Sequence, residues 1–142
     1  APDPAKLQGK QDRRRSDEKV EDSLALARRR EMMAAYGCAV QAIEEDCRNP
    51  FAYINRAMFF SMNGVLADAL EDCKLSVYLD AKFVDGYKLL GKVLNDMKEP
   101  RAAIEYGLLN AVELSKSGEL DKELQMHINA AVNAYKKTIA SK

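Results

Sequence analysis

The feature that most constrains this chain is an internal repeat with a period of 34 residues. Four pairs of positions separated by this period keep their side-chain size: Tyr53 and Tyr87, Ala57 and Gly91, Phe60 and Leu94, and Ala69 and Ala103. A weaker third copy lies one period earlier, at Ser23, Leu26, Ala35 and Ala42. Repeats of this length indicate a stack of supersecondary units, each of which buries its apolar face against the next unit.

Each copy shows the pattern of two amphipathic helices. In the second copy, Asn49 and Pro50 favour a helix start, because Pro at the first helical position lacks only an N–H that would have no partner there. Apolar side chains then recur at helical spacing up to a turn at Asn63 and Gly64, and again from Leu66 to Val77. The sequence therefore predicts an all-α fold built from antiparallel helix pairs.

The register predicts three helix pairs, over residues 16–49, 50–83 and 84–116, between a polar N-terminal segment (1–15) and a C-terminal capping helix (117–142). We expect residues 1–15 to be disordered or loosely helical, and Ser16 to be the first N-cap. Residues 16–46 are predicted to form two helices; one long helix is the alternative, because Arg30 stands where a turn glycine is expected. The capping helix is predicted from an apolar stripe: Leu120, Leu124, Ile128, Ala131, Val132, Tyr135 and Ile139.

Composition excludes several classes of protein. The 142 residues suit one domain or one stack of repeats, and 22 Lys and Arg balance 22 Asp and Glu. Zero net charge argues against a general binder of nucleic acid or of a membrane surface, so neither is predicted as a partner. The arginine triplets at 13–15 and 28–30 have acidic neighbours, which is typical of solvated faces. No apolar run approaches the ~18 residues of a membrane span, and the first residues are interpreted as a boundary inside a longer protein.

No pattern in the sequence predicts an active site. Cys38, Cys47 and Cys73 form no CxxC pair, which argues against a disulfide framework and favours a reducing, cytoplasmic location. Cys73 falls at a core position, and Cys38 and Cys47 are expected to be exposed or partly buried. His127 is the single histidine and has no second ligand at metal-binding spacing. We therefore predict no catalytic residue, no metal and no cofactor, and a protein that is not an enzyme.

Two stretches resemble the tetratricopeptide repeat (TPR) of chaperone cofactors: Tyr53-Ile54-Asn55-Arg56-Ala57, and Ala69-Leu70-Glu71-Asp72-Cys73-Lys74 with the following Asp80-Ala81-Lys82-Phe83. The resemblance covers residues 17–114. It implies a right-handed superhelical stack of about three repeats, whose concave surface is lined by the first helix of each pair, here residues 17–28, 50–62 and 84–96. Gly107 and Asn110 depart from the family pattern, so the end of the helix that starts at Pro100 is expected to shift by one residue.

The resemblance also implies a carboxylate clamp, in which Lys, Arg and Asn side chains grip the terminal carboxylates of heat-shock chaperones. Its five positions in this chain are occupied by Val20, Leu24, Asn55, Asp85 and Leu89. Only Asn55 keeps the family residue, and Asp85 would repel a carboxylate. The clamp is therefore predicted to be lost.

The predicted groove is mostly apolar and comprises Val20, Leu24, Phe51, Ile54, Asn55, Met58, Met62, Asp85, Lys88, Leu89 and Lys92. Exposed apolar side chains with adaptable methionines favour a helical or hydrophobic protein segment as the ligand. The sequence thus predicts a non-catalytic interaction module or adaptor that binds a protein or peptide. Three alternatives remain: a groove filled by the chain's own N-terminal segment, a homodimer, and a co-chaperone domain that engages Hsp70- or Hsp90-type chaperones despite the lost clamp.

Overall fold

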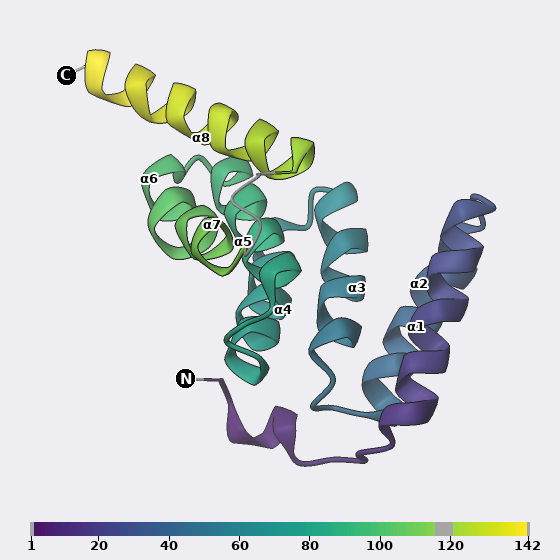
Figure 1. The fold of residues 1–142 in the computed structure, drawn as a ribbon. Helices are drawn as coiled ribbons and strands as arrows, with labels where there is room; N and C mark the ends of the chain where they lie inside the picture. Colours follow the sequence, from purple (N-terminus) through teal and green to yellow (C-terminus); the bar gives the residue numbers. More distant parts are fainter. Residues whose placement is uncertain (1, 116–120, 142) are drawn as a thin grey trace. The chain divides into compact units, whose positions relative to one another are not determined.

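The computed structural model describes residues 2–115 and 121–141 (Figure 1). The described residues form helices joined by turns, with one isolated antiparallel bridge between Gln11 and Asp46. The chain divides into two compact units, Ala1–Ala81 (unit 1) and Lys82–Lys142 (unit 2). The predicted all-α fold class is confirmed.

Unit 1 contains two helix pairs. The first pair is α1 (Arg13–Arg28) with α2 (Met32–Glu45), and the second is α3 (Pro50–Met62) with α4 (Leu66–Leu79). Residues 16–46 therefore form two helices, as predicted. The predicted N-cap at Ser16 is wrong, because Asp12 caps α1 and its carboxylate accepts the backbone N–H of Arg15 at 3.2 Å.

The turn within each pair places one residue in the left-handed region of backbone conformation. These residues are Arg30, Gly64 and Lys98, with φ values of 62°, 74° and 67°, and they lie one period apart. Glycine adopts this conformation freely, whereas a residue with a side chain loses on the order of 1 kcal/mol there. The repeat is thus present in the backbone as well as in the sequence.

Small side chains form the seam between α1 and α2. Ser16 and Ser23 are fully buried, and their hydroxyls donate to the carbonyls of Ala42 at 2.6 Å and Ala35 at 2.7 Å. Because a buried hydroxyl is stable only when it is hydrogen-bonded, these bonds explain why serine is tolerated at Ser16, a position predicted to be a cap. Small side chains at this seam let α1 and α2 approach closely.

The N-terminal segment is ordered, which corrects the expectation of disorder. Residues Pro4–Leu7 form the 3-10 helix η1, and Leu7 is buried against Tyr53 and Leu75. The backbone N–H groups of Asp12 and Cys47 donate to Glu45 (2.8 Å) and Lys10 (3.1 Å). The segment is therefore held across the ends of α3 and α4, as Figure 1 shows. Cys47 is buried rather than exposed or partly buried, and Cys38 is half-buried.

Unit 2 begins with α5 (Val84–Asp96), followed by α6 (Pro100–Ala102), a π-helical stretch η2 (Ala103–Leu108) and α7 (Leu109–Leu114). Two glycines explain the distortion, since a Cβ on Gly107 would lie 2.5 Å from the backbone N of Gly91. A π-helical turn inserts one extra residue, which is the shift of one residue predicted for this helix.

The last helix, α8 (Lys122–Ala140), packs against α5, α6 and η2. Asp121 is its N-cap and accepts the backbone N–H of Leu124 at 2.7 Å. Leu124 and Ala131 of the predicted apolar stripe are fully buried. Ile139 is exposed, so the stripe ends earlier than predicted, and Leu120 lies outside the described residues.

Candidate functional site

The predicted groove residues of unit 1 lie on two neighbouring helices. Val20 and Leu24 belong to α1, and Phe51, Ile54, Asn55, Met58 and Met62 belong to α3. The spacing of three or four residues places the members of each set on one side of their helix. We call this set of seven residues the inner face.

Polar contacts at the start of α3 fix α1 beside it. The Asn49 amide donates to Ser16 Oγ and Asp17 Oδ1, both at 2.9 Å, and its oxygen accepts the backbone N–H of Phe51 at 3.1 Å. The Arg13 guanidinium lies 5.5 Å from the centre of the Phe51 ring. The buried Asn49 thus uses both of its amide hydrogens and its oxygen to align the two helices whose side chains form the inner face.

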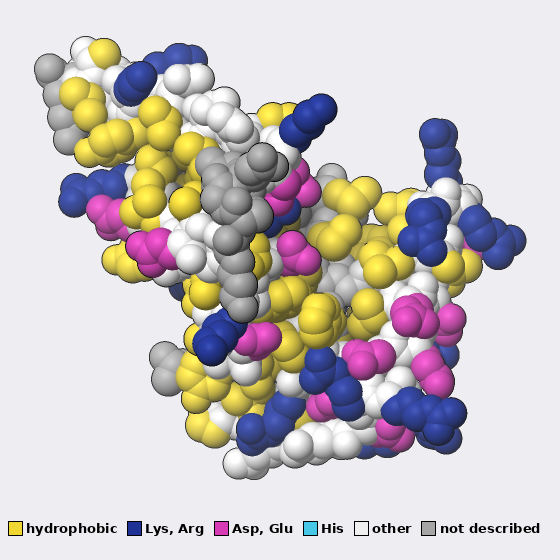
Figure 2. All heavy atoms as spheres, viewed as in Figure 1, with side chains coloured by type: hydrophobic (Ala, Val, Ile, Leu, Met, Phe, Trp, Pro, Cys, Tyr) yellow, Lys and Arg dark blue, Asp and Glu magenta, His cyan; other side chains and the backbone are white. Residues whose placement is uncertain are grey.

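The inner face exposes four large apolar side chains. The exposed fractions are 36% for Leu24, 46% for Phe51, 40% for Met58 and 65% for Met62, whereas Ile54 is buried beneath them. Figure 2 shows hydrophobic side chains on the surface around α3 in the same view as Figure 1. Soluble proteins rarely leave such side chains grouped without a binding role.

Asn55 is buried in the inner face with an unsatisfied amide. Its Oδ1 and Nδ2 atoms are inaccessible to solvent, and neither has a hydrogen-bond partner among the described residues. A buried polar group in this state costs about 1–3 kcal/mol. Asn55 therefore differs from Asn49, six residues earlier, whose amide is fully bonded.

A buried ion pair supports the back of α3. Nε of Arg56 lies 2.8 Å from Asp72 Oδ2, and a second guanidinium nitrogen lies 2.8 Å from Oδ1. The hydrogen bonds to Asp72 raise the pKa of Arg56. The same guanidinium lies 5.5 Å from the centre of the Phe60 ring. This bidentate pair links α3 to α4 and fixes the rotation of α3.

The predicted groove residues of unit 2 are partly engaged within the unit. Lys88 lies 3.1 Å from Asp121, 3.5 Å from Glu123 and 4.0 Å from Asp85. Burial alone would lower the pKa of Lys88, but the hydrogen bond to Asp121 and the neighbouring carboxylates raise it. Lys88 therefore anchors α8, a role that the sequence did not predict.

The other members of this predicted set lie along α5. Lys92 pairs with Asp96 at 2.8 Å, Leu89 is half-buried, and Asp85 is exposed. That Lys92 belongs to a binding groove stays a prediction, whereas Lys88 forms ion pairs with carboxylates of its own unit.

The structure places Cys73 in the core, as predicted. Its thiol is fully buried, and burial raises its pKa to about 12. A thiol in this state is unreactive at neutral pH. His127 lies 3.5 Å from Glu123 on α8. In residues 2–115 and 121–141 no group of three or more metal-binding side chains occurs, and no helix has the length and hydropathy needed to cross a membrane.

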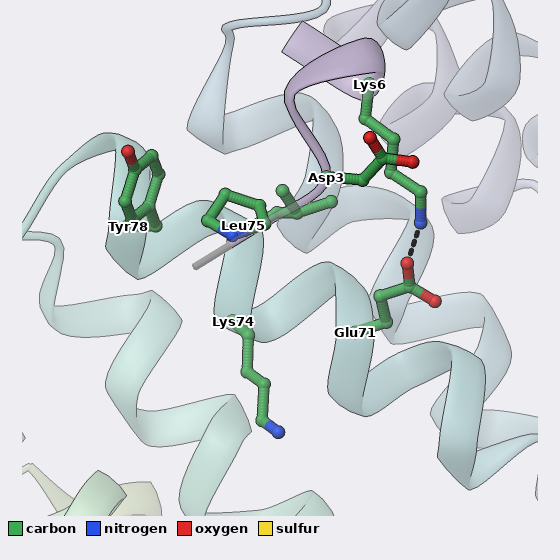
Figure 3. Close-up of a pocket in the computed structure, with 7 residues that line it drawn as sticks. Asp3, Lys6, Glu71, Lys74, Leu75 and Tyr78 are labelled. Atoms are coloured by element: carbon green, nitrogen blue, oxygen red, sulfur yellow. Dashed lines mark ion pairs between the residues drawn. The ribbon is translucent and has the colours of Figure 1, made fainter.

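A pocket of about 380 Å³ lies between the N-terminal segment and α4 (Figure 3). Lys6 points toward Glu71 and forms an ion pair with it, whereas Lys74 points away from that pair. Tyr78 and Leu75 form the apolar wall. The sequence did not predict this pocket, because Leu7 is the single large apolar residue before residue 16 and gives no periodic pattern.

Antiparallel helix pairs at a period of 34 residues, each with a left-handed turn residue, define a tetratricopeptide-repeat fold. The first TPR domain of Spaghetti (RPAP3), solved with an HSP90 peptide, matches with a TM-score of 0.78 and 19% identity, over 89% of this chain and 97% of that one. The Sgt2 TPR domain from Aspergillus fumigatus matches with a TM-score of 0.80 and 23% identity, over 88% and 82%. The TPR2B domain of yeast Sti1, in complex with an Hsp70 peptide, matches with a TM-score of 0.76 and 19% identity, over 84% and 97%.

The sequence comparison agrees with the fold. Hsp70-Hsp90 organizing protein 2 of Arabidopsis thaliana is 35% identical over 65 residues, which is 46% of this chain and 11% of that protein. The match thus spans about a tenth of the relative's length. No family model matches the chain. The chain has the TPR fold and is similar in structure to TPR domains of chaperone cofactors.

Proposed function

We propose that the chain is a non-catalytic adaptor whose inner face binds a helical or hydrophobic segment of a partner protein. The observation that carries the proposal is the exposure of Leu24, Phe51, Met58 and Met62 on one face of α1 and α3. Burial of these side chains by a partner removes apolar surface from water, which stabilises a complex by roughly 25 cal/mol per Å² before the costs of association.

The chemistry of the inner face favours an apolar segment over a charged tail. Val20 and Leu24 occupy two clamp positions and carry no charge, and Asp85 in unit 2 carries the wrong charge for a carboxylate ligand. Methionine side chains adapt to irregular apolar surfaces. An amphipathic helix with apolar anchors three and four residues apart fits such a surface.

The unsatisfied amide of Asn55 supports a polar anchor beneath this apolar surface. Because its atoms are shielded, a ligand reaches them only when a flanking side chain such as Phe51 or Met58 moves. A partner carbonyl or carboxylate would then accept from Nδ2 and relieve the cost of the buried amide. Binding is therefore expected to fix side chains that are adaptable in the free chain.

The second candidate is a co-chaperone domain that engages Hsp70- or Hsp90-type chaperones. Asn55, the retained clamp residue, favours it, as do the solved relatives in complex with Hsp90 and Hsp70 peptides. A homodimer through the inner face and a cytoplasmic location stay predictions. Self-occlusion by the N-terminal segment disagrees with its position, since Leu7 packs against Tyr53 and Leu75.

Two synthetic peptides distinguish the candidates in fluorescence anisotropy titrations. One is the HSP90 peptide SRMEEVD with a free C-terminus. The other is an acetylated and amidated helix of about 18 residues, with leucines at helical spacing and equal numbers of Glu and Lys. We expect the helix to bind with micromolar affinity and the HSP90 peptide not to bind.

Met58→Glu is expected to abolish binding of the helix, because it places a charge in the apolar contact. Met126→Glu is the matched control, since Met126 is exposed on α8 outside the inner face. If SRMEEVD binds instead and Asn55→Ala removes its binding, the co-chaperone candidate replaces the adaptor proposal.

A further inference from the structure

A second apolar pocket, of about 410 Å³, opens in unit 1 between the start of α2 and the end of α3. It is lined by Met32, Met33, Tyr36, Phe59, Met62 and Asn63. Tyr36 gives it a fixed wall, because its ring packs edge-on against Phe59 at 6.2 Å and Phe60 at 5.9 Å. We call it the edge pocket; among its lining residues, only Met62 also belongs to the inner face.

The mouth of the edge pocket is flexible and apolar. Met33 is 91% exposed and Met62 is 65% exposed. Two unbranched, polarizable side chains at the entrance adapt to a bulky apolar group. Met33 and Met62 thus continue the apolar lining of the pocket onto the surface, and contiguous exposed apolar surface is typical of a binding site.

Three exposed arginines directly precede the α2 residues that line this pocket. Arg28 ends α1, and Arg29 and Arg30 form the turn that leads into Met32. Arg29 lies 3.9 Å from Glu31, whereas Arg28 and Arg30 form no ion pair with any described residue. Figure 2 shows Lys and Arg side chains gathered at the upper right, where Figure 1 places the end of α1.

The backbone conformation of Arg30 belongs to the repeat. Arg30 has a φ of 62°, in the conformation that Gly64 and Lys98 adopt at the equivalent turns. An arginine here destabilises the turn relative to glycine. At this turn the repeat thus carries an exposed cation without an ion pair among the described residues, two residues before Met32 of the edge pocket.

We propose that the edge pocket docks a protein segment in which a bulky apolar side chain is flanked by acidic residues. The apolar side chain fills the space between Met33, Tyr36 and Met62, and the flanking carboxylates pair with Arg28 and Arg30. This site shares only Met62 with the inner face, because Met33 and Tyr36 lie on α2. The chain thus has two recognition surfaces that differ in ligand charge.

Selection from a display library of random peptides of about 12 residues tests the proposal. The peptides are displayed through their C-termini, so that no free carboxylate is available to a clamp. We expect enriched peptides to combine a bulky apolar residue with two or more acidic residues. Synthetic amidated versions are expected to lose binding to Met33→Glu and to keep binding to Met58→Glu.

Arg30→Gly and Lys98→Gly form a matched pair, because each replaces a left-handed residue with glycine at equivalent turns two periods apart. Both are expected to raise Tm, by about 2–4 °C for a chain of this size. Only Arg30→Gly is expected to weaken the peptides, by about two- to fivefold at low salt, as for an exposed charge pair. This loss of affinity is expected to disappear when NaCl is raised from about 50 mM to about 500 mM.

The proposal is overturned if no peptide is enriched, if enriched peptides lack acidic residues, or if they bind Met33→Glu as well as the wild type. Loss of binding in Met58→Glu alone would also overturn it and would support the inner face instead. An oligouridine RNA tests phosphate as the ligand chemistry. Binding of this RNA that depends on Arg30 and not on Met33 would replace a protein segment with a nucleic acid.

Discussion

The two units use the same repeat in different ways. In unit 1 the helix pairs are regular, and their inner face leaves large apolar side chains exposed and one amide without a hydrogen-bond partner among the described residues. In unit 2 the first helix is engaged from two sides, by the contact of Gly91 with Gly107 and by the pairing of Lys88 with Asp121. A single sequence period therefore produces one unit with a surface available for binding and one unit whose equivalent helix supports a capping helix.

The difference between the units follows from what packs against α3 in unit 1 and against α5 in unit 2. Lys88 and Asn55 both occupy positions where the sequence predicts groove contacts. Lys88 is held by α8, and its carboxylate partner Asp121 has a lowered pKa, first because it accepts the Leu124 backbone N–H and then because of Lys88. Asn55 has no such partner among the described residues. At these two groove positions, only Asn55 in unit 1 keeps free hydrogen-bonding capacity; on α5 the Oδ1 atom of Asn95 is also buried without a hydrogen-bond partner among the described residues.

The largest loss of stability is expected from a substitution that breaks the close contact between Gly91 and Gly107 in unit 2. Gly107→Ala places a Cβ within 2.6 Å of the Gly91 backbone, which cannot move aside as a flexible side chain can. We expect a loss of about 4 kcal/mol in the free energy of unfolding, measured by urea denaturation. Gly37→Ala in α2 is the control: its Cβ meets nothing within 4 Å, so stability should rise by about 0.5–1 kcal/mol. Equal effects of the two variants would contradict this account of unit 2.

The next largest loss of stability is expected from breaking the ion pair between Arg56 and the buried Asp72 in unit 1. Arg56→Ala leaves Asp72 buried and unpaired, which should cost about 3 kcal/mol. Arg101 forms an ion pair of similar length with Glu105, at 2.9 Å, on the exposed surface of unit 2. Arg101→Ala is therefore expected to leave the urea midpoint unchanged. A comparable loss in both variants would show that burial does not distinguish the two pairs.

Substitutions of the two buried asparagines, Asn49 at the N-cap of α3 and Asn55 within it, are expected to change the free energy of unfolding in opposite directions. Asn49→Ala removes three hydrogen bonds and should destabilise the fold by about 2 kcal/mol. Asn55→Leu replaces an unsatisfied amide with an apolar group of similar volume and should stabilise it by about 1 kcal/mol. Destabilisation of both variants would indicate that Asn55 contributes to the free fold.

Alkaline pH should weaken unit 1 through Cys73 and Tyr53, because burial raises both pKa values to about 12. Above pH 9.0, the ordinary pKa of a thiol, Cys73 releases its proton in the unfolded state but keeps it in the folded state. Stability therefore falls with pH, by about 1.4 kcal/mol per pH unit from this group. Between pH 9 and 10, below the range of Tyr53, the slope should be reduced in Cys73→Ala. An unchanged slope would contradict this assignment.

Much of the fold follows from local patterns. The predicted inner ranges 50–62 and 84–96 coincide with α3 and α5, because Pro50, Asn63 and the apolar spacing act within one helix. The order of the N-terminal segment was missed, since it depends on one leucine and on backbone contacts with residues about 35 positions away. Ser16 was misassigned for a similar reason: its partner, Ala42, lies on another helix.

The sequence predicts which residues lie on one face of the candidate site, but not which of their polar groups are hydrogen-bonded or paired within the fold. Helical spacing placed Leu24, Phe51, Met58 and Met62 on one face, and their exposure agrees with it. The missing hydrogen-bond partner of Asn55 and the ion pair of Lys88 with Asp121 depend on which side chains approach from other parts of the fold. The edge pocket requires the turn at Arg30 to bring α2 beside the end of α3, which no single helical pattern contains.

The most direct measurement uses the chain labelled with ¹³C at its methionine methyl groups, titrated with the neutral amphipathic helix described above. Six methionines report on these surfaces: Met58 on the inner face, Met62 where the inner face meets the edge pocket, Met32 and Met33 in the edge pocket alone, and Met97 and Met126 in unit 2. Saturable shifts of the Met58 and Met62 signals, with those of Met97 and Met126 unchanged, are the predicted result. Unchanged Met58 and Met62 signals, or shifts confined to unit 2, would contradict the proposal that the inner face of unit 1 binds the partner.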